Sequence, residues 1–332
     1  MRSIVFSFII LGSVFAASMA RPGNPEVIRL KSTIALPGVV GRIDHMTVDR
    51  RSDRLFVVAL GNNTVEVVDM KLGNRIKSLP GFNEPQGVLY VEKSNRLYVA
   101  NGGNGNLDVI DGSSYKRITS IPVGDDADNV RLDTSSGIIF VAFGEGGLAA
   151  IDPGLNNVQY TIVLPAHPEA FVIEPGGSRI FVNVPGKEKV FVVDKGKRAI
   201  IDSWAIGEAS SNFPMAYEPA KNRLFVGCRN PAAIVMLEAK SGKLLNTLMI
   251  GGDVDDVFFD AKRRRLLASC GEGLVSILSE NPAGTFSIEA TVATRRGGRT
   301  ALLIPDQDKY VVAVPKNGNA DAEIRLFSLA GD

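Results

Sequence analysis

A short strand-like run recurs seven times along this chain, at intervals of 41 to 44 residues. The copies read RLFV (54–57), RLYV (96–99), IIFV (138–141), RIFV (179–182), RLFV (223–226), RLLA (265–268) and KYVV (309–312). Each run joins apolar, β-branched and aromatic residues after a polar turn, which is typical of a β-strand. A fixed period of this length over seven units indicates an array of identical structural units, so the repeat limits the fold more than any other feature.

Each unit carries further strand patterns at fixed places around this run. Upstream copies read HMTVD (45–49), GVLYV (87–91), NVRLD (129–133), AFVIE (170–174), PMAYE (214–218), DVFFD (256–260) and TALLI (300–304). Downstream copies read TVEVVD (64–69), NLDVID (106–111), GLAAID (147–152), KVFVVD (189–194), AIVMLE (233–238), LVSILS (274–279) and EIRLFS (323–328). A fourth strand follows in most units, as in NRIKSLP (74–80). Four short antiparallel strands per unit predict one blade of a β-propeller.

The two ends of the chain predict how the ring closes. The last unit stops after its third strand, whereas the segment 27–38 resembles the fourth strand of the other units. We therefore expect an all-β, seven-bladed β-propeller over residues 27–332, in which the N-terminal strand completes the last blade and removes the open sheet edges. Two stacked β-sandwiches are the rival architecture, but they do not predict a repeat that continues through seven units.

The run RLYVAN (96–101), followed by NLDVID (106–111), resembles the YVTN repeat of bacterial β-propellers of the YncE-like group. The resemblance extends from about residue 27 to the end of the chain. It implies the propeller fold. It does not imply one activity, because relatives of this architecture include binding proteins, dehydrogenase subunits, lactonases and lyases.

The first twenty residues differ in character from the rest. Arg2 precedes an apolar run over 4–16, and Ser18-Met19-Ala20 supplies small residues before Arg21. This pattern predicts a signal peptide over 1–20, and hence a periplasmic or secreted protein. The run is too short to span a membrane well, so we expect no membrane span after cleavage.

Two cysteines, Cys228 and Cys270, occupy equivalent positions in neighbouring units. An oxidising compartment would permit a disulfide. We favour the alternative that both are small residues packed in the core, because a single pair does not form a disulfide framework.

The repeats stop matching at the start of the upstream strand, where a propeller opens into its central channel. Counting twelve residues back from the third residue of each RLFV-type run gives one polar and varied ring: Asp44, Gln86, Asp128, Glu169, Phe213, Asp255 and Arg299. Adjacent positions add His45, Asn129 and Asp256, and the neighbouring turns and loops add Arg42, His167, Asn212 and Arg229. Both histidines of the chain, His45 and His167, belong to this set. The alternative explanation is that a wet channel mouth is polar without any specific role.

One hypothesis is a binding module. The acidic side chains would select a polar or cationic small molecule or the end of a glycan or peptide, while Arg42, Arg229 and Arg299 would orient a carboxylate. The second hypothesis is a divalent-metal-dependent hydrolase, similar in architecture to propeller lactonases, or a lyase. Its metal ligands would be Asp128, Glu169 and Asp255, its cofactor a cation such as Ca²⁺, and its general base His45 or His167.

Other functions find less support. The formal net charge of +1 gives no electrostatic signal for nucleic acid. The chain has no G-x-S-x-G motif and no phosphate loop, and its glycine-rich stretches lie between strands, where hairpin turns are expected. A closed ring with sealed edges is expected to be a monomer.

Overall fold

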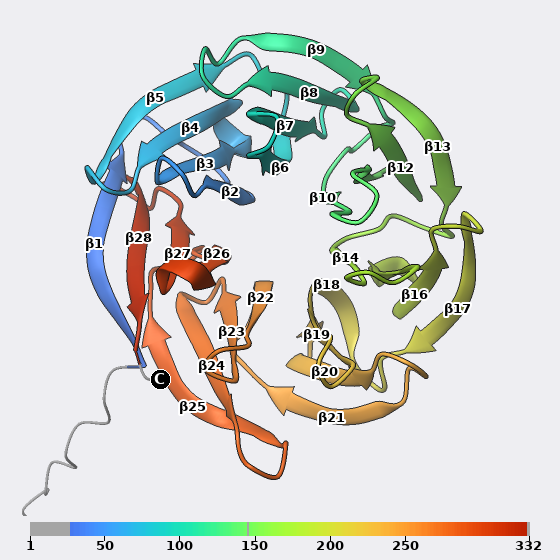
Figure 1. The fold of residues 1–332 in the computed structure, drawn as a ribbon. Coiled ribbons are helices and arrows are strands. Elements are labelled where there is room, and N and C mark those ends of the chain that lie inside the picture. Colours follow the sequence, from blue (N-terminus) through green and yellow to red (C-terminus); the bar gives the residue numbers. More distant parts are fainter. Residues whose placement is uncertain (1–26, 145, 331–332) are drawn as a thin grey trace, which may run out of the picture.

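The computed structural model describes residues 27–144 and 146–330, so the predicted signal peptide lies outside the described residues. Within them the chain forms seven antiparallel four-stranded sheets arranged as a ring, with almost no helix (Figure 1). This arrangement confirms the predicted all-β, seven-bladed propeller. No helix in the described part of the chain has the length and apolar composition needed to cross a membrane.

Six blades take their strands in chain order from the central channel outward. The first two are β2 (Met46–Asp49), β3 (Arg54–Ala59), β4 (Thr64–Asp69) and β5 (Asn74–Pro80), then β6 (Pro85–Val91), β7 (Arg96–Asn101), β8 (Asn106–Asp111) and β9 (Arg117–Pro122). The next two are β10 (Val130–Leu132), β11 (Ile139–Phe143), β12 (Gly147–Asp152) and β13 (Asn157–Val163), then β14 (Phe171–Ile173), β15 (Arg179–Val184), β16 (Lys189–Asp194) and β17 (Ala199–Ala205). The last two are β18 (Ser210–Glu218), β19 (Arg223–Asn230), β20 (Ala232–Glu238) and β21 (Leu244–Met249), then β22 (Val254–Asp260), β23 (Arg265–Cys270), β24 (Leu274–Glu280) and β25 (Phe286–Ala293).

The seventh blade joins the two ends of the described chain. Its strands, from the channel outward, are β26 (Thr300–Ile304), β27 (Lys309–Val314), β28 (Ala322–Leu329) and β1 (Ile28–Leu36). β1 pairs antiparallel with β28 over its whole length, with one irregularity between Leu30 and Ser32 (Figure 1). The N-terminal strand therefore completes the last blade, as the sequence predicts.

The repeated RLFV-type run forms the second strand of every blade. Both faces of this strand are buried, because alternate residues pack toward different neighbouring blades. In β3, Leu55 and Val57 belong to the core shared with the seventh blade, while Phe56 and Val58 belong to the core shared with the next blade. Such burial on both faces explains why these runs are continuously apolar rather than alternating.

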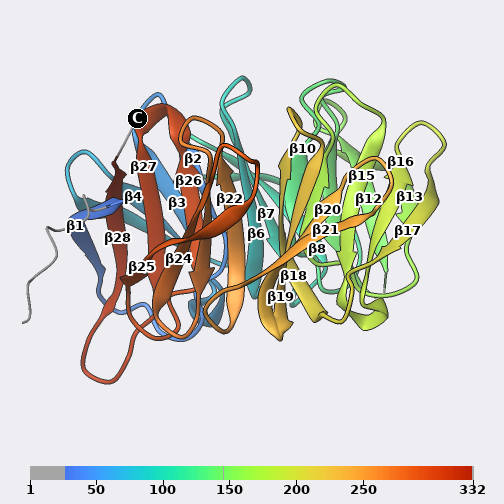
Figure 2. The ribbon, with the colours of Figure 1, turned by 90° about the horizontal axis from the view of Figure 1, so that it is seen from below.

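The core is divided among the contacts between blades, and two of these cores contain the cysteines. Cys228 and Cys270 lie in different apolar clusters, are fully buried and are free thiols. The structure thus confirms the expectation that both are packed core residues. The blades stand side by side around the ring axis, with connecting loops gathered on two opposite faces (Figure 2).

Candidate functional site

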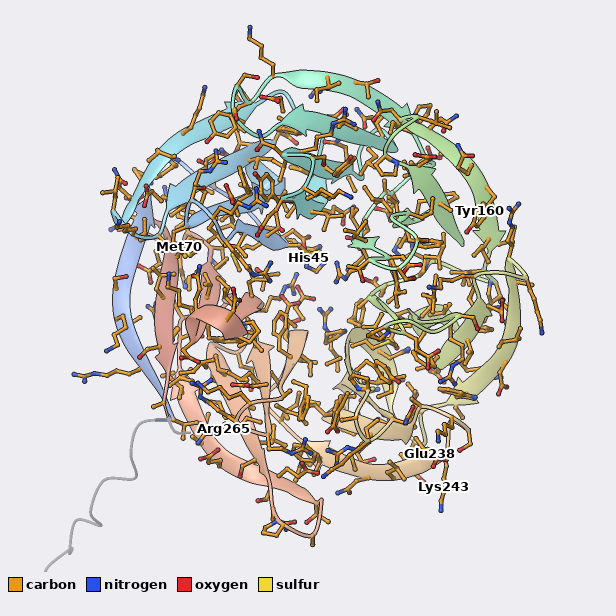
Figure 3. The ribbon with its side chains drawn as sticks, in the orientation of Figure 1. His45, Met70, Tyr160, Glu238, Lys243 and Arg265 are labelled. Atoms are coloured by element: carbon orange, nitrogen blue, oxygen red, sulfur yellow. The ribbon has the colours of Figure 1, made fainter. Side chains whose placement is uncertain are left out.

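A cavity of about 460 Å³ opens on the face at which the innermost strands begin. Its lining comes from all seven blades: Arg42, Leu60, Glu84, Gln86, Asp126, Asp128, His167, Glu169, Phe213, Arg229, Asp255 and Arg299. We call this space the funnel. A narrower space below it is lined in addition by Asp44, His45, Asn129 and Ala170. Figure 3 places His45 beside the central channel and Tyr160 at the outer rim.

The ring positions are equivalent because the same main-chain hydrogen bonds fix them. Asp44, Asp128 and Glu169 each donate their N–H to a carbonyl of the second strand of their own blade, at 2.9 to 3.0 Å. The backbone is thus held identically, whereas the side chain is free to differ from blade to blade. All seven predicted ring residues line either the funnel or the narrow space below it. Their roles in binding remain predictions.

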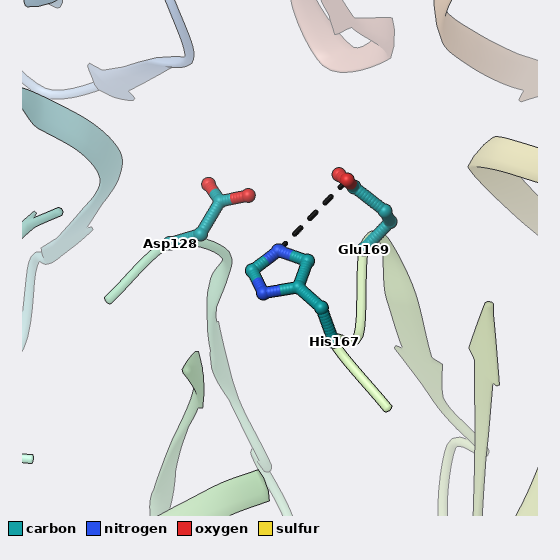
Figure 4. A group of neighbouring side chains, drawn as sticks. All are labelled: Asp128, His167 and Glu169. Carbon is teal, nitrogen blue, oxygen red and sulfur yellow. Dashed lines mark ion pairs between the residues drawn. The ribbon is translucent and has the colours of Figure 1, made fainter. Parts of the chain in front are cut away.

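Asp128, His167 and Glu169 form a compact group of side chains in the funnel that could hold a metal ion. Each offers a ligand atom that lies within 4.8 Å of the other two. His167 Nε2 lies 3.9 Å from Glu169 Oε1, and Asp128 approaches from the neighbouring blade (Figure 4). His167 and Glu169 lie in the link between β13 and β14, and Asp128 lies two residues before β10.

The two acids of this group hold protons unusually tightly. Burial, together with the nearby carboxylates Asp44 and Glu169, raises the pKa of Asp128 to about 7 against the opposing effect of His45. Burial likewise raises the pKa of Glu169 to about 7, with a further contribution from Asp255. A carboxylate whose charged form is penalised in this way favours a bound cation or a bound proton. The group can therefore act as a cation site or as a proton donor near neutral pH.

Asp255 lies outside the compact group of Asp128, His167 and Glu169, and the predicted metal set of Asp128, Glu169 and Asp255 stays a prediction. Asp255 Oδ1 accepts a hydrogen bond from Arg229, and its Oδ2 lies 3.1 Å from Arg299 Nε. The Arg229 guanidinium also lies 3.8 Å over the ring of Phe213. Asp255 is thus paired with two arginines, whereas the group that could hold a metal contains His167 beside Asp128 and Glu169.

The other histidine lies deeper. His45 Nε2 is 3.9 Å from Asp44 Oδ1 and 4.0 Å from Asp128 Oδ1, and so lies near carboxylates of the first and third blades. Asp44 pairs in turn with Arg42 at 2.7 Å. Burial raises the pKa of Asp44, while His45 and Arg42 oppose that shift. Of the two histidines, His45 is therefore the one that lies near both Asp44 and Asp128.

Two predicted residues have structural partners instead of a place in the funnel. The Asn212 amide is fully buried and donates to Asn183 Oδ1 and to the main-chain carbonyl of Lys189, both at 3.0 Å. It ties two blades together and does not line the cavity. Asp256 accepts a hydrogen bond of 2.7 Å from the Ala301 N–H.

Asp256 lines a different cavity, of about 280 Å³, farther along the channel. That cavity also contains Arg131 and the side chains of Met215, Tyr217 and Phe258. Burial raises the pKa of Asp256 well above its usual range, and burial lowers that of Arg131. Asp256 therefore belongs to this mixed apolar cavity and not to the funnel.

Sequence reasoning missed three acids that line or border the funnel. Glu84 and Asp126 are lining residues, and Asp253 lies 3.0 Å from Arg299 Nη1. Each lies two residues before a ring position, in the left-handed backbone region with φ between 48° and 58°. Arg42 and His167 occupy the same place in their own blades. Counting fourteen residues back from the third residue of each RLFV-type run, in addition to twelve, would have found these positions.

Comparison with known proteins identifies the architecture. No protein-family model and no curated protein matches the sequence. A chain of the Kuenenia stuttgartiensis hydrazine synthase matches with a TM-score of 0.73 at 18% identity, covering 84% of this chain and 95% of its own length. A chain from the crystal structure of a mitotic checkpoint complex gives a TM-score of 0.76 at 14% identity, covering 98% and 100%. Identities this low show only that the chain shares the β-propeller fold.

Proposed function

We propose that this protein is an exported propeller of the YVTN type that binds a small polar ligand in the funnel. The family proposal is supported by the repeated RLFV-type runs, each of which forms the second strand of a blade. The export proposal is supported by the sequence pattern over residues 1–20. The ligand would be a small molecule or the exposed end of a glycan or peptide.

The observation that carries the proposal is the size and chemistry of the funnel. A volume of about 460 Å³ falls within the range of small-molecule sites. Charged groups of both signs converge there from different blades, among them Arg42, Asp128 and Glu169. A wet but unused channel mouth does not require acids to be buried to the point at which their pKa reaches about 7. Such burial costs stability, and binding sites commonly keep such groups.

The test is a thermal-shift screen of small carboxylates, amines, sugars and peptides, followed by calorimetric titration of each hit. Phe213→Ala and Arg42→Ala are expected to weaken binding at least about tenfold, a loss of roughly 1.4 kcal/mol. Arg51→Ala is the matched control, because this arginine is 74% exposed and pairs with Glu92 away from the funnel. A screen without hits, or hits that bind the funnel variants as well as the unchanged protein, would refute the proposal.

Export has its own test. Expression of the full chain should yield a mature protein that begins at Arg21, as read by N-terminal sequencing of the periplasmic or culture fraction. A variant lacking residues 2–20 should remain in the cytoplasm. Recovery of uncleaved full-length chain in the cytoplasm would contradict the export proposal without affecting the funnel.

A hydrolase or lyase that uses the same funnel is the second candidate. The favouring observation is the position of His45, about 4 Å from carboxylates on either side. Such a histidine can act as a general base, with an acid returning the proton. The measurement is turnover of lactones and of acidic polysaccharides with and without added divalent metal. Turnover that survives His45→Gln, or an absence of turnover, would remove this candidate.

A further inference from the structure

The group formed by Asp128, His167 and Glu169 has the ligand types and the spacing of a metal site. Its three ligand atoms lie within 4.8 Å of one another. Ligand atoms about 2.0–2.2 Å from a shared ion would lie roughly 3–4 Å apart, so only small side-chain movements separate this arrangement from coordination. The ligands come from two neighbouring blades, where they lie in the links that lead into the innermost strands β10 and β14.

The orientation of His167 is that of a metal-bound histidine. Its Nδ1 lies 2.7 Å from the main-chain carbonyl oxygen of Gly144. A carbonyl oxygen can only accept, so Nδ1 carries the hydrogen and the lone pair of the neutral ring lies on Nε2. Nε2 is the atom that faces Glu169. A backbone partner for the distal nitrogen fixes the tautomer of metal-ligating histidines in general.

Asp128 supplies an independent sign that a cation belongs here. The residue is only 7% exposed, and its Oδ1 is buried without a hydrogen-bond partner. A buried carboxylate oxygen without a partner is costly. The nearest nitrogen of a basic side chain, His45 Nε2, is still 4.0 Å away. Asp128 is also one of the residues that line the funnel.

We propose that Asp128, His167 and Glu169 bind one divalent transition metal of the Zn²⁺ class. The imidazole nitrogen distinguishes this set from the all-oxygen sites that Ca²⁺ prefers, so the expected Ca²⁺ is replaced by a metal that accepts mixed nitrogen and oxygen ligands. Three protein ligands leave coordination positions open toward the funnel. Those positions would take an oxygen of the ligand, a small carboxylate or hydroxy compound, and this last step rests on the proposed function.

The experiment is calorimetric titration of ZnCl₂ into chelator-treated, dialysed full-length protein, with CaCl₂ as the comparison metal. We expect one Zn²⁺ per chain and at least tenfold weaker binding of Ca²⁺. His167→Ala and Asp128→Asn should each weaken Zn²⁺ binding at least about tenfold, since even partners of metal ligands contribute 10- to 100-fold. Glu208→Gln, an exposed acid far from the group in the sequence, is the matched control.

A spectroscopic readout guards against variants that bind less because they fold less well. Co²⁺ added to the unchanged protein should give visible absorption bands that His167→Ala loses while its circular dichroism spectrum stays the same. Loss of Zn²⁺ binding in Asp255→Asn but not in His167→Ala would overturn the proposed ligand set, as would the absence of any saturable Zn²⁺ binding. If Zn²⁺ binds saturably but no organic ligand binds the protein, the metal site stands and the proposed ligand-binding function is rejected. If an organic ligand binds but Zn²⁺ does not, the ligand-binding function stands and the metal site is rejected.

Discussion

Gly87 packs directly against the main-chain carbonyl of Asp128. A Cβ atom placed on Gly87 would lie 2.0 Å from the Asp128 oxygen and 3.0 Å from a methyl group of Val130. Gly87 belongs to β6, and Asp128 leads into β10 of the next blade. The absence of a side chain at one innermost strand therefore sets how closely the next blade approaches, beside an acid that lines the funnel.

Gly87→Ala should consequently force the two blades apart at this point. We expect a loss of about 1–3 kcal/mol in the free energy of unfolding, the usual range for overpacking a tight interior. We also expect weaker Zn²⁺ binding, because Asp128 would shift. Denaturant titration and calorimetry measure the two effects. Gly186→Ala is the control, since its Cβ would meet only the Ala166 methyl at 3.6 Å. Equal stability of the two variants would contradict the predicted clash.

Acid should weaken the contact between the fifth and sixth blades. Burial raises the pKa of Glu280, but hydrogen bonds from Arg223, Lys221 and Arg264 outweigh it and lower the pKa to about 2 from its ordinary 4.5. A carboxyl with a lowered folded-state pKa stabilises the protein above about pH 4.5 and loses that contribution as the pH falls toward 2. The difference corresponds to about 3 kcal/mol at neutral pH.

Glu280→Gln should remove most of this contribution at pH 7 and flatten the dependence of stability on pH between 5 and 3. Urea titrations at a series of pH values, compared with the exposed Glu208→Gln, make the measurement. If Glu280→Gln loses stability with falling pH as steeply as Glu208→Gln and the unchanged protein do, Glu280 is not the source of the acid sensitivity.

The two thiols should be inert in the folded protein. Burial raises the pKa of Cys228 to about 12 and that of Cys270 to about 11. At pH 8 the thiolate, which is the reactive form, is then at most about one part in a thousand. A thiol reagent such as dithionitrobenzoate should detect no thiol in the native state and two in guanidinium. Rapid native-state reaction, or fewer than two thiols after unfolding, would contradict free, buried cysteines.

The sequence predicts the fold well because each strand is determined locally. Both faces of strands such as β3 are buried, and the continuous apolar run therefore appears in every repeat. Equivalent positions in equivalent units also predict which residues surround the channel. The ring that includes Asp44, Asp128 and Glu169 follows from counting alone, since the same hydrogen bonds hold each of them.

The partners of these side chains could not be predicted in the same way. Asp255 pairs with Arg229 from the preceding blade and Arg299 from the following one, at distances that depend on three side-chain conformations. His167 pairs with the Gly144 carbonyl, which belongs to the turn between β11 and β12. Counting gives the position of a residue on the ring, but not the direction of its side chain. The metal set that we propose therefore contains His167 where the sequence alone suggested Asp255.

Closure of the ring by β1 leads to a prediction about truncation. β1 buries Ile28, Ile34 and Leu36 against the last blade, and loss of a large buried aliphatic residue typically costs about 2–5 kcal/mol. A variant that begins at residue 37 should unfold at lower temperature than one that begins at residue 27. It should also aggregate, because β28 would present an unpaired edge.

Thermal unfolding and light scattering of these two variants test the prediction. Lys31→Ala is the control, because it changes β1 without removing a buried side chain. Lys31 is exposed and lies at the irregularity of the strand. Adding a peptide of residues 27–36 to the shortened variant should restore part of its stability, because the edge of β28 regains its partner. Equal melting temperatures for the two chain lengths would mean that the ring is held by contacts between the other blades and that β1 only covers its outer edge.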